Sequence, residues 1–320
     1  MGESHRTAGP TSRADAAAFI ATATSLAAEH ALETLLPVLR AAGADPIAIK
    51  GPLQARWLYD TPRRPPVDLD LLVAPGDVAA TGAALRGLGY SPYLDPGDGS
   101  GTGYAQTWRK DGSVTVDLHW SLAGADRKLL WPALAAATET AAIGAETARV
   151  PTVPGRAFVL ALHAAQHGPE EPHVADDLAR ALAIVDDDGW REAAALAHKA
   201  GAGPAFAAGL RTLPQGRTLA AALALPDLTT PELEIRLAGE PHTALAFRRL
   251  ADTTGAGPRA RLLARELAPP ATFMRDKYDF ARRGSAGLAL AYLYRPIWLA
   301  WWAPRGYLAW RRARKAAEAS

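Results

Sequence analysis

The chain has 320 residues, 49% of them apolar, and a formal net charge of +2, which is typical of a globular protein of two domains and not of a nucleic-acid binder. It contains no cysteine, which excludes disulfides, thiolate metal sites and cysteine nucleophiles. Segment 1–13 lacks the apolar stretch of a signal peptide, and proline and arginine interrupt the apolar run 288–310, so we expect a cytoplasmic protein.

The first part of the chain alternates helix and strand patterns. Leucines at helical spacing predict a helix over 14–42. Alternation of apolar and acidic residues predicts a strand over 67–73, and Asp111-Gly112 predicts a hairpin turn. Further strands are predicted at 46–50, 88–93, 104–110 and 114–120, and further helices at 53–59 and 75–87.

Strand patterns nearly vanish beyond about residue 125. Helical stretches broken by glycine and proline, beginning with 129–137, take their place. We therefore expect an α+β domain over 14–150 and a helical domain over 151–320.

The strand 67–73 carries the strongest functional signal. Its apolar residues share one face, and Asp68 and Asp70 share the other, because side chains alternate along a strand. Two like charges side by side in so apolar a strand are costly unless a cation lies between them. Magnesium is a hard ion usually held by one or two carboxylates and substrate phosphates. The pattern indicates metal-assisted phosphate chemistry, although a solvated edge strand would show the same alternation.

A second alternating strand carries Asp117 and His119 on one face and Val116 and Leu118 on the other. Asp117 would add a third carboxylate if this strand lies beside the first. His119 could orient an acceptor, pass a proton or hydrogen-bond a carboxylate, and we favour this last, supporting role.

These motifs resemble those of the polymerase-β-like nucleotidyltransferase superfamily, and within it a bacterial group of uncharacterised nucleotidyltransferases. The matching segments, within about 25–190, are Ile49-Lys50-Gly51, Leu58-Tyr59, Arg64, 68–73, 88–90, 116–120 and 162–168. The resemblance implies a polymerase-β-like α+β domain with a small mixed sheet, followed by an all-α domain. It also implies Mg²⁺-dependent transfer of an NMP group from an NTP, with ATP as one such donor, and release of pyrophosphate.

The same resemblance implies that Asp68, Asp70 and Asp117 are catalytic metal ligands holding two Mg²⁺ ions. Two ions about 4 Å apart lower the pKa of an attacking hydroxyl and stabilise charge on the leaving group.

Phosphate binding is expected at Lys50-Gly51, where glycine permits close backbone approach. The superfamily usually has serine or a second glycine after this glycine, whereas this chain has Pro52. Lys50 would therefore supply the contact as a point charge, and a plain tight turn is the alternative. Arg64, and less so Arg63, could clamp triphosphate oxygens.

His163 and His167 stand four residues apart on one helix face, with Asp177 in the next predicted helix. Their spacing can bind zinc, but the glutamate of an HExxH motif is missing. We favour a structural or substrate-side role, and the resemblance suggests that this helix and Asp177 pack over the nucleotide cleft.

Segment 288–315 contains four tryptophans with arginines between and after them. Such a segment can lie in a membrane interface. The favoured interpretation is a helix packed on the C-terminal domain with a solvated basic tail.

The leading hypothesis is an enzyme, a nucleotidyltransferase with an unidentified small-molecule or protein acceptor. Long nucleic acid is disfavoured by the modest net charge. The altered Lys50-Gly51-Pro52 turn keeps an alternative open, a catalytically inactive nucleotide-binding or scaffold protein, such as an accessory of a biosynthetic or defence operon.

Overall fold

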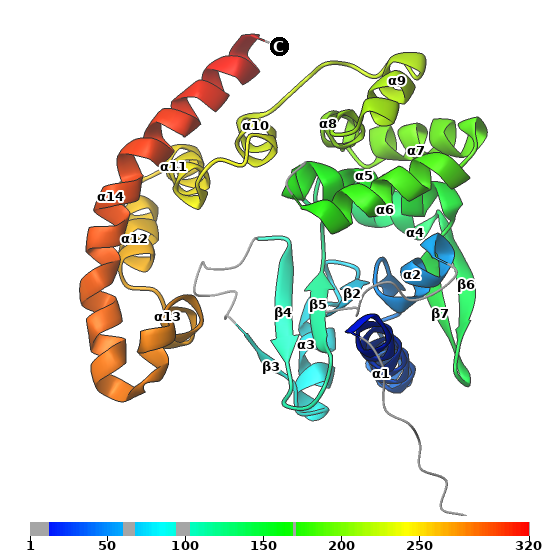
Figure 1. Cartoon of the computed structure of the whole chain (residues 1–320), viewed down its shortest axis with the longest axis horizontal. Coiled ribbons are helices and arrows are strands. Elements are labelled where there is room, and N and C mark those ends of the chain that lie inside the picture. The colour runs from blue at the N-terminus through cyan, green and yellow to red at the C-terminus, as the bar shows by residue number, and fades with distance from the viewer. Residues whose placement is uncertain (1–12, 60–67, 94–102, 169–170, 320) are drawn as a thin grey trace, which may run out of the picture. The chain divides into compact units, whose positions relative to one another are not determined.

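The computed structural model describes residues 13–59, 68–93, 103–168 and 171–319 (Figure 1). Its contacts divide the chain into two compact units. Unit 1 comprises 1–91, 108–118 and 139–150, and unit 2 comprises 92–107, 119–138 and 151–320.

A seven-stranded mixed sheet forms the framework that positions the two acidic strands. Its order is β3-β4-β5-β2-β1-β7-β6, so β5 and β2 are direct neighbours. Strand β1 pairs antiparallel with β2, with Ile47 opposite Leu72, and parallel with β7. The strands are β1 (Ile47–Ala48), β2 (Asp68–Leu72), β3 (Ser91–Pro92), β4 (Ala105–Arg109), β5 (Thr115–His119), β6 (Thr138–Ile143) and β7 (Glu146–Pro151).

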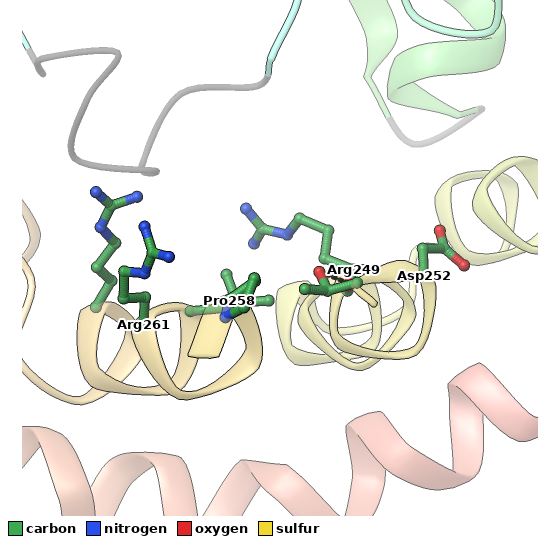
Figure 2. A pocket seen from close by; sticks show the side chains of 7 residues that line it. Arg249, Asp252, Pro258 and Arg261 are labelled. Atoms are coloured by element: carbon green, nitrogen blue, oxygen red, sulfur yellow. Dashed lines mark hydrogen bonds between the residues drawn. The ribbon is translucent and has the colours of Figure 1, made fainter. Parts of the chain in front are cut away.

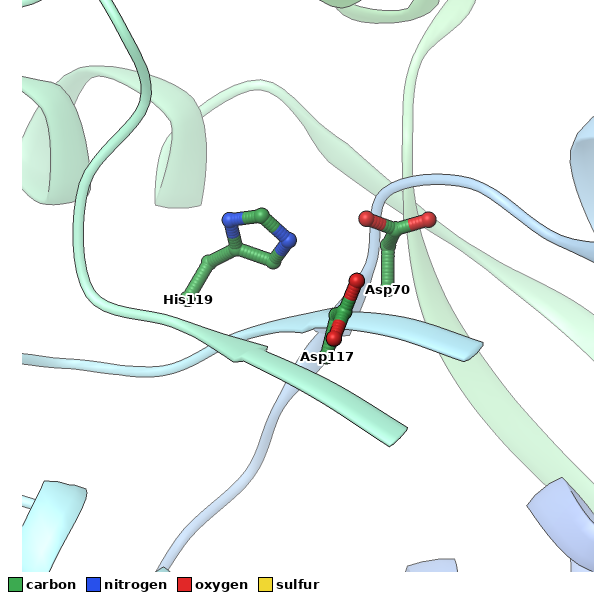
Figure 3. Close-up of side chains that lie close together, drawn as sticks. All are labelled: Asp70, Asp117 and His119. Carbon is green, nitrogen blue, oxygen red and sulfur yellow. The ribbon is translucent and has the colours of Figure 1, made fainter. Parts of the chain in front are cut away.

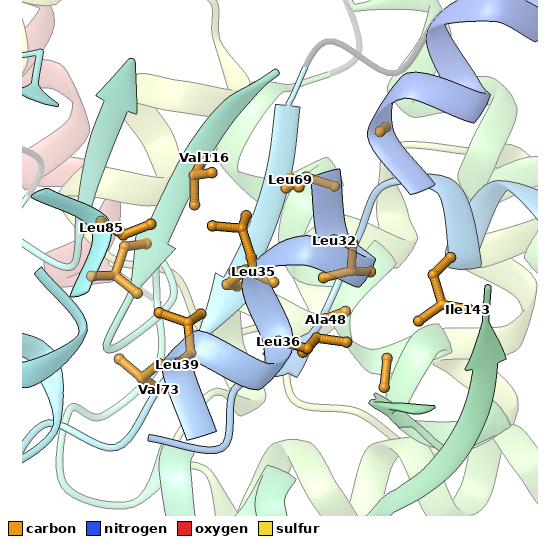
Figure 4. Packing of buried hydrophobic residues seen from close by; sticks show 14 of the residues in the cluster. Leu32, Leu35, Leu36, Leu39, Ala48, Leu69, Val73, Leu85, Val116 and Ile143 are labelled. Atoms are coloured by element: carbon orange, nitrogen blue, oxygen red, sulfur yellow. The ribbon is translucent and has the colours of Figure 1, made fainter. Parts of the chain in front are cut away.

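Helix α1 (Arg13–Ala41) packs its leucine face on this sheet (Figure 4). Leu32, Leu35, Leu36 and Leu39 are all at most 2% exposed, and they share a core with the apolar residues of β2 and β5. Burying a leucine side chain contributes about 1.5–3 kcal/mol, so this core fixes which face of β2 points inward. Unit 1 also contains α2 (Pro52–Leu58) and α3 (Val78–Gly87).

Unit 2 is largely helical. In α5 and α8, Phe158 and Phe206 are fully buried, and Trp190 of α7 lies beside Phe206. Its helices are α4 (Leu130–Ala135), α5 (Val153–His167), α6 (Pro172–Ile184), α7 (Asp187–Lys199), α8 (Gly203–Arg211), α9 (Pro214–Ala222), α10 (Pro231–Leu237), α11 (His242–Asp252), α12 (Ala256–Leu267), α13 (Ala271–Lys277), the 3₁₀ helix η2 (Asp279–Arg282) and α14 (Gly284–Ala319). Among the described residues, no helix has the length and apolarity needed to cross a bilayer.

The expected α+β fold with a mixed sheet and a mostly helical C-terminal region is confirmed. The expectation that strands end near residue 125 is wrong, because β6 and β7 follow. Their alternation is weak: β6 lies at the sheet edge, and in β7 alanine occupies one of the buried positions, although alanine is a poor strand former. The positive φ of Gly144 between them marks the turn.

Candidate active site

The two aspartates of β2 lie on the side of the strand opposite Leu69 and Leu71. Both leucines are buried in the core beneath α1, so alternation directs Asp68 and Asp70 to the other face. Asp70 is buried with 3% exposure, whereas Asp68, at the start of the strand, is half-buried.

Strand β5 brings two further polar side chains to Asp70. Figure 3 shows Asp117 and His119 of β5 beside Asp70 of β2. One possible ligand atom from each of the three residues lies within 4.8 Å of the others. Val116 and Leu118 are buried in the core on the opposite face, which fixes the direction of the polar pair.

The donor set fits a divalent cation. Two carboxylates supply the hard oxygen ligands that Mg²⁺ and Mn²⁺ prefer, whereas imidazole is a ligand better suited to Zn²⁺, Fe²⁺, Ni²⁺ and Cu²⁺. In the part of the chain that the structure describes, this is the only such cluster of three ligand-bearing residues.

Lys50 lies beside the carboxylate of Asp70, a contact that its position in the sequence did not predict. The backbone N–H of Ile49 donates to the carbonyl oxygen of Asp70 at 3.0 Å, which extends the β1–β2 pairing to the edge of the site. The next side chain, Lys50, then forms an ion pair with Asp70, with Nζ 3.0 Å from Oδ1. Lys50 was predicted to contact phosphate, but in this structure its ammonium group binds the carboxylate of Asp70, one of the three residues of the acidic cluster Asp70, Asp117 and His119.

The charges around Lys50 connect it to all three aspartates. Burial by itself lowers the pKa of Lys50, but its hydrogen bond to Asp70 and the negative charges of Asp70, Asp68 and Asp117 outweigh burial and raise the pKa above 10.5. Lys50 is therefore a permanent cation within range of Asp68 as well as of the clustered residues.

Gly51 forms the turn between Lys50 and α2. Its φ of 94° lies in the region that favours glycine, and a Cβ added there would lie 3.5 Å from the carbonyl oxygen of Asp68. Pro52 begins α2 at its first position, where the missing N–H of proline leaves no helical hydrogen bond unmade. The turn thus keeps the backbone of Gly51 close to the start of β2.

The roles of the other predicted site residues are not tested by this geometry. Arg63 and Arg64 lie outside the described residues. His163 and His167 of α5 have ring centroids 4.4 Å apart, and Asp177 is buried in α6. All three belong to unit 2, so their supporting role stays a prediction.

Comparison with known proteins identifies a family. The family described as "Uncharacterised nucleotidyltransferase" matches residues 8–216, which include every residue of the acidic cluster. No curated protein matches the chain. The chain therefore belongs to the uncharacterised nucleotidyltransferase family.

Proposed function

We propose that this protein is a Mg²⁺-dependent nucleotidyltransferase that transfers an NMP group from an NTP to an acceptor and releases pyrophosphate. The observation that supports this most is the approach of Asp70 and Asp117 on adjacent strands, with His119 beside them. In the reaction, an acceptor oxygen bonds to the α-phosphorus, the bond from that phosphorus to the bridging oxygen breaks, and the acceptor loses its proton.

In this proposal Asp70 and Asp117 would hold a divalent cation, and Asp68 would add the carboxylate for a second. When bound, the cations would stabilise the charge that develops on the phosphoryl oxygens. His119 orients the carboxylates, and the backbone at Gly51 approaches the triphosphate. Lys50 neutralises Asp70 until the nucleotide arrives.

A transfer assay tests the proposal. The purified chain would be incubated with α-³²P-labelled NTPs, MgCl₂ and a lysate or small-molecule library that provides acceptors. We expect a labelled product with the wild type and none with Asp70→Asn. Asp111→Asn is the matched control, because Asp111 is exposed in the hairpin turn of the same sheet. Absence of both labelled product and NTP binding would contradict the proposal.

One observation favours a second candidate, a nucleotide-binding protein without turnover. The ammonium group of Lys50 already neutralises Asp70. If Lys50 holds that position permanently, NTP could bind without reacting. Isothermal titration with NTP and Mg²⁺, alongside the transfer assay, separates the two candidates, because only the second predicts binding without product.

A further inference from the structure

Basic and acidic residues are unevenly distributed along the chain, although its net charge is near zero. Residues 241–320 carry 15 Lys and Arg against five Asp and Glu, a formal charge of +10. Residues 1–240 carry 20 basic and 28 acidic side chains, a formal charge of −8. A basic terminal region of this kind favours contact with an anionic macromolecule or surface.

Helix α14 dominates this basic region and buries only one of its faces. The helices α10–α13 lie along one side of it (Figure 1), and Ala291, Arg295, Gly306 and Ala309 of α14 are buried there. Gly306 permits the close approach, since a Cβ at this position would overlap Thr243 of α11. The packed side of α14 is therefore fixed by contacts within unit 2.

The opposite side of α14 is apolar and exposed. We call it the outer face and define it by Leu290, Leu293, Ile297, Trp301 and Leu308, which recur at helical spacing. Leu293, Ile297 and Trp301 are 71%, 68% and 65% exposed. The outer face extends for about 27 Å along the helix, at 1.5 Å per residue. Contiguous exposed apolar surface on this scale marks an interaction site.

Beyond Leu308, basic residues lie on the same side of α14 as the outer face. Arg311 and Lys315 follow Leu293 and Ile297 by about five full turns, so they project in the same direction. Over its length α14 carries six Lys and Arg and a single acidic residue, Glu318.

We propose that the outer face of α14 binds an anionic membrane surface, with the helix lying in the interface and not crossing it. Its leucines, isoleucine and tryptophan would enter the headgroup–acyl boundary, while Arg311 and Lys315 contact anionic headgroups. Four of the five side chains of the outer face are aliphatic, whereas single-stranded bases stack on aromatic groups, so the outer face favours lipid over nucleic acid. A parallel second copy would place like charges together, which disfavours self-association.

The structure also supplies a charge-matched control. A pocket between α11 and α12 is lined by arginines, and Figure 2 shows Arg249 and Arg261 pointing away from α14. Arg265 lines the same pocket. Reversing Arg261 and Arg265 changes the net charge as much as reversing Arg311 and Lys315, but it leaves the outer face intact.

Flotation of the full chain tests the proposal. We expect it to float with phosphatidylcholine vesicles that contain phosphatidylglycerol, and less with phosphatidylcholine alone or at high salt. Leu293→Glu/Ile297→Glu and Arg311→Glu/Lys315→Glu should each lower the bound fraction by about tenfold or more. The controls Ile184→Glu/Leu228→Glu, also at exposed apolar positions, and Arg261→Glu/Arg265→Glu should stay within about threefold of the wild type.

A second readout needs no variant. Lipids brominated on the acyl chain should quench tryptophan fluorescence of the unmodified chain, because exposed Trp301 would reach their depth. Absence of quenching and of flotation would overturn the proposal. The proposal would also be overturned if Leu293→Glu/Ile297→Glu floated with vesicles to the same extent as the wild type. A dimer that this variant dissolves, or binding of a labelled oligonucleotide without vesicle binding, would assign the outer face to another partner and equally refute it.

Discussion

Replacing Lys50 by methionine isolates the ion pair at the centre of the site. The substitution removes the ammonium group and keeps an unbranched apolar chain of similar length. In the wild type, Nζ lies 3.0 Å from Asp70 Oδ1, and the two side chains are only 19% and 4% exposed. The variant therefore removes this ion pair from a buried carboxylate.

The expected loss of unfolding free energy in Lys50→Met follows from this burial. Breaking a fully buried ion pair by removing one partner costs about 3–5 kcal/mol, and the partial exposure of Lys50 reduces this to about 2–4 kcal/mol of unfolding free energy. The cost should shrink when MgCl₂ is added, because a divalent cation bound at Asp70 and Asp117 replaces the missing charge.

Urea denaturation in EDTA and in MgCl₂ measures both effects. Lys128→Met is the control, since Lys128 is exposed and should change stability by less than about 0.5 kcal/mol. In a double-mutant cycle, Lys50→Met and Asp70→Asn should couple by about 1–3 kcal/mol. If Lys50→Met is as stable as the wild type in EDTA, or if Mg²⁺ stabilises both chains equally, the assigned role of Lys50 is wrong.

The other predictions concern the carboxylates, the turn and the titration of Lys50. Asp117→Asn should lower the transfer rate at least about 100-fold with an unchanged circular dichroism spectrum, and activity near the wild-type level would remove Asp117 from the site. Gly51→Ala should lower the free energy of unfolding by about 1–2 kcal/mol, because Gly51 has a positive φ. The control Gly76→Ala, at a position with open space and no positive φ, should lower it by less than about 1 kcal/mol. Equal unfolding free energies of the two variants would contradict the strained turn at Gly51. Because the folded-state pKa of Lys50 is raised, the stability that the wild type gains over Lys50→Met should be constant below pH 10.5 and lost as pH rises through the folded-state pKa. Denaturation at pH 9 to 12 measures this, and a stability difference that grows with pH would refute it.

The parts of the fold that could be predicted are those with a strong local pattern. The leucine spacing of α1 and the alternation along β2 each specify an element and its buried face, because burial of those side chains is what stabilises the element. The approach of Asp117 to Asp70 followed once the two strands were assumed to be neighbours. That assumption came from family resemblance, since the alternation within β5 does not specify its partner strand.

What escaped prediction depends on contacts between segments. The Lys50–Asp70 pair requires the antiparallel register of β1 with β2, and β1 has only two residues, too few to show periodicity. Helix α14 continues through Pro296 and Pro304, where the sequence suggested interruption. Both prolines are exposed, so their rings lie away from the face that packs on α10–α13.

The charge balance of the site constrains how it can load cations. Asp68, Asp70 and Asp117 together carry three negative charges that act on Lys50, and Lys50 offsets one of them. Among these four groups the net charge is then −2, which a single divalent cation neutralises. A second cation would add uncompensated positive charge until a triphosphate brings its own negative charge. The two-ion site expected from the carboxylate pattern should therefore fill in order, with one Mg²⁺ per chain in calorimetry without nucleotide and the second entering only with NTP. In Lys50→Met the first site tightens, because one more negative charge remains for the ion to neutralise.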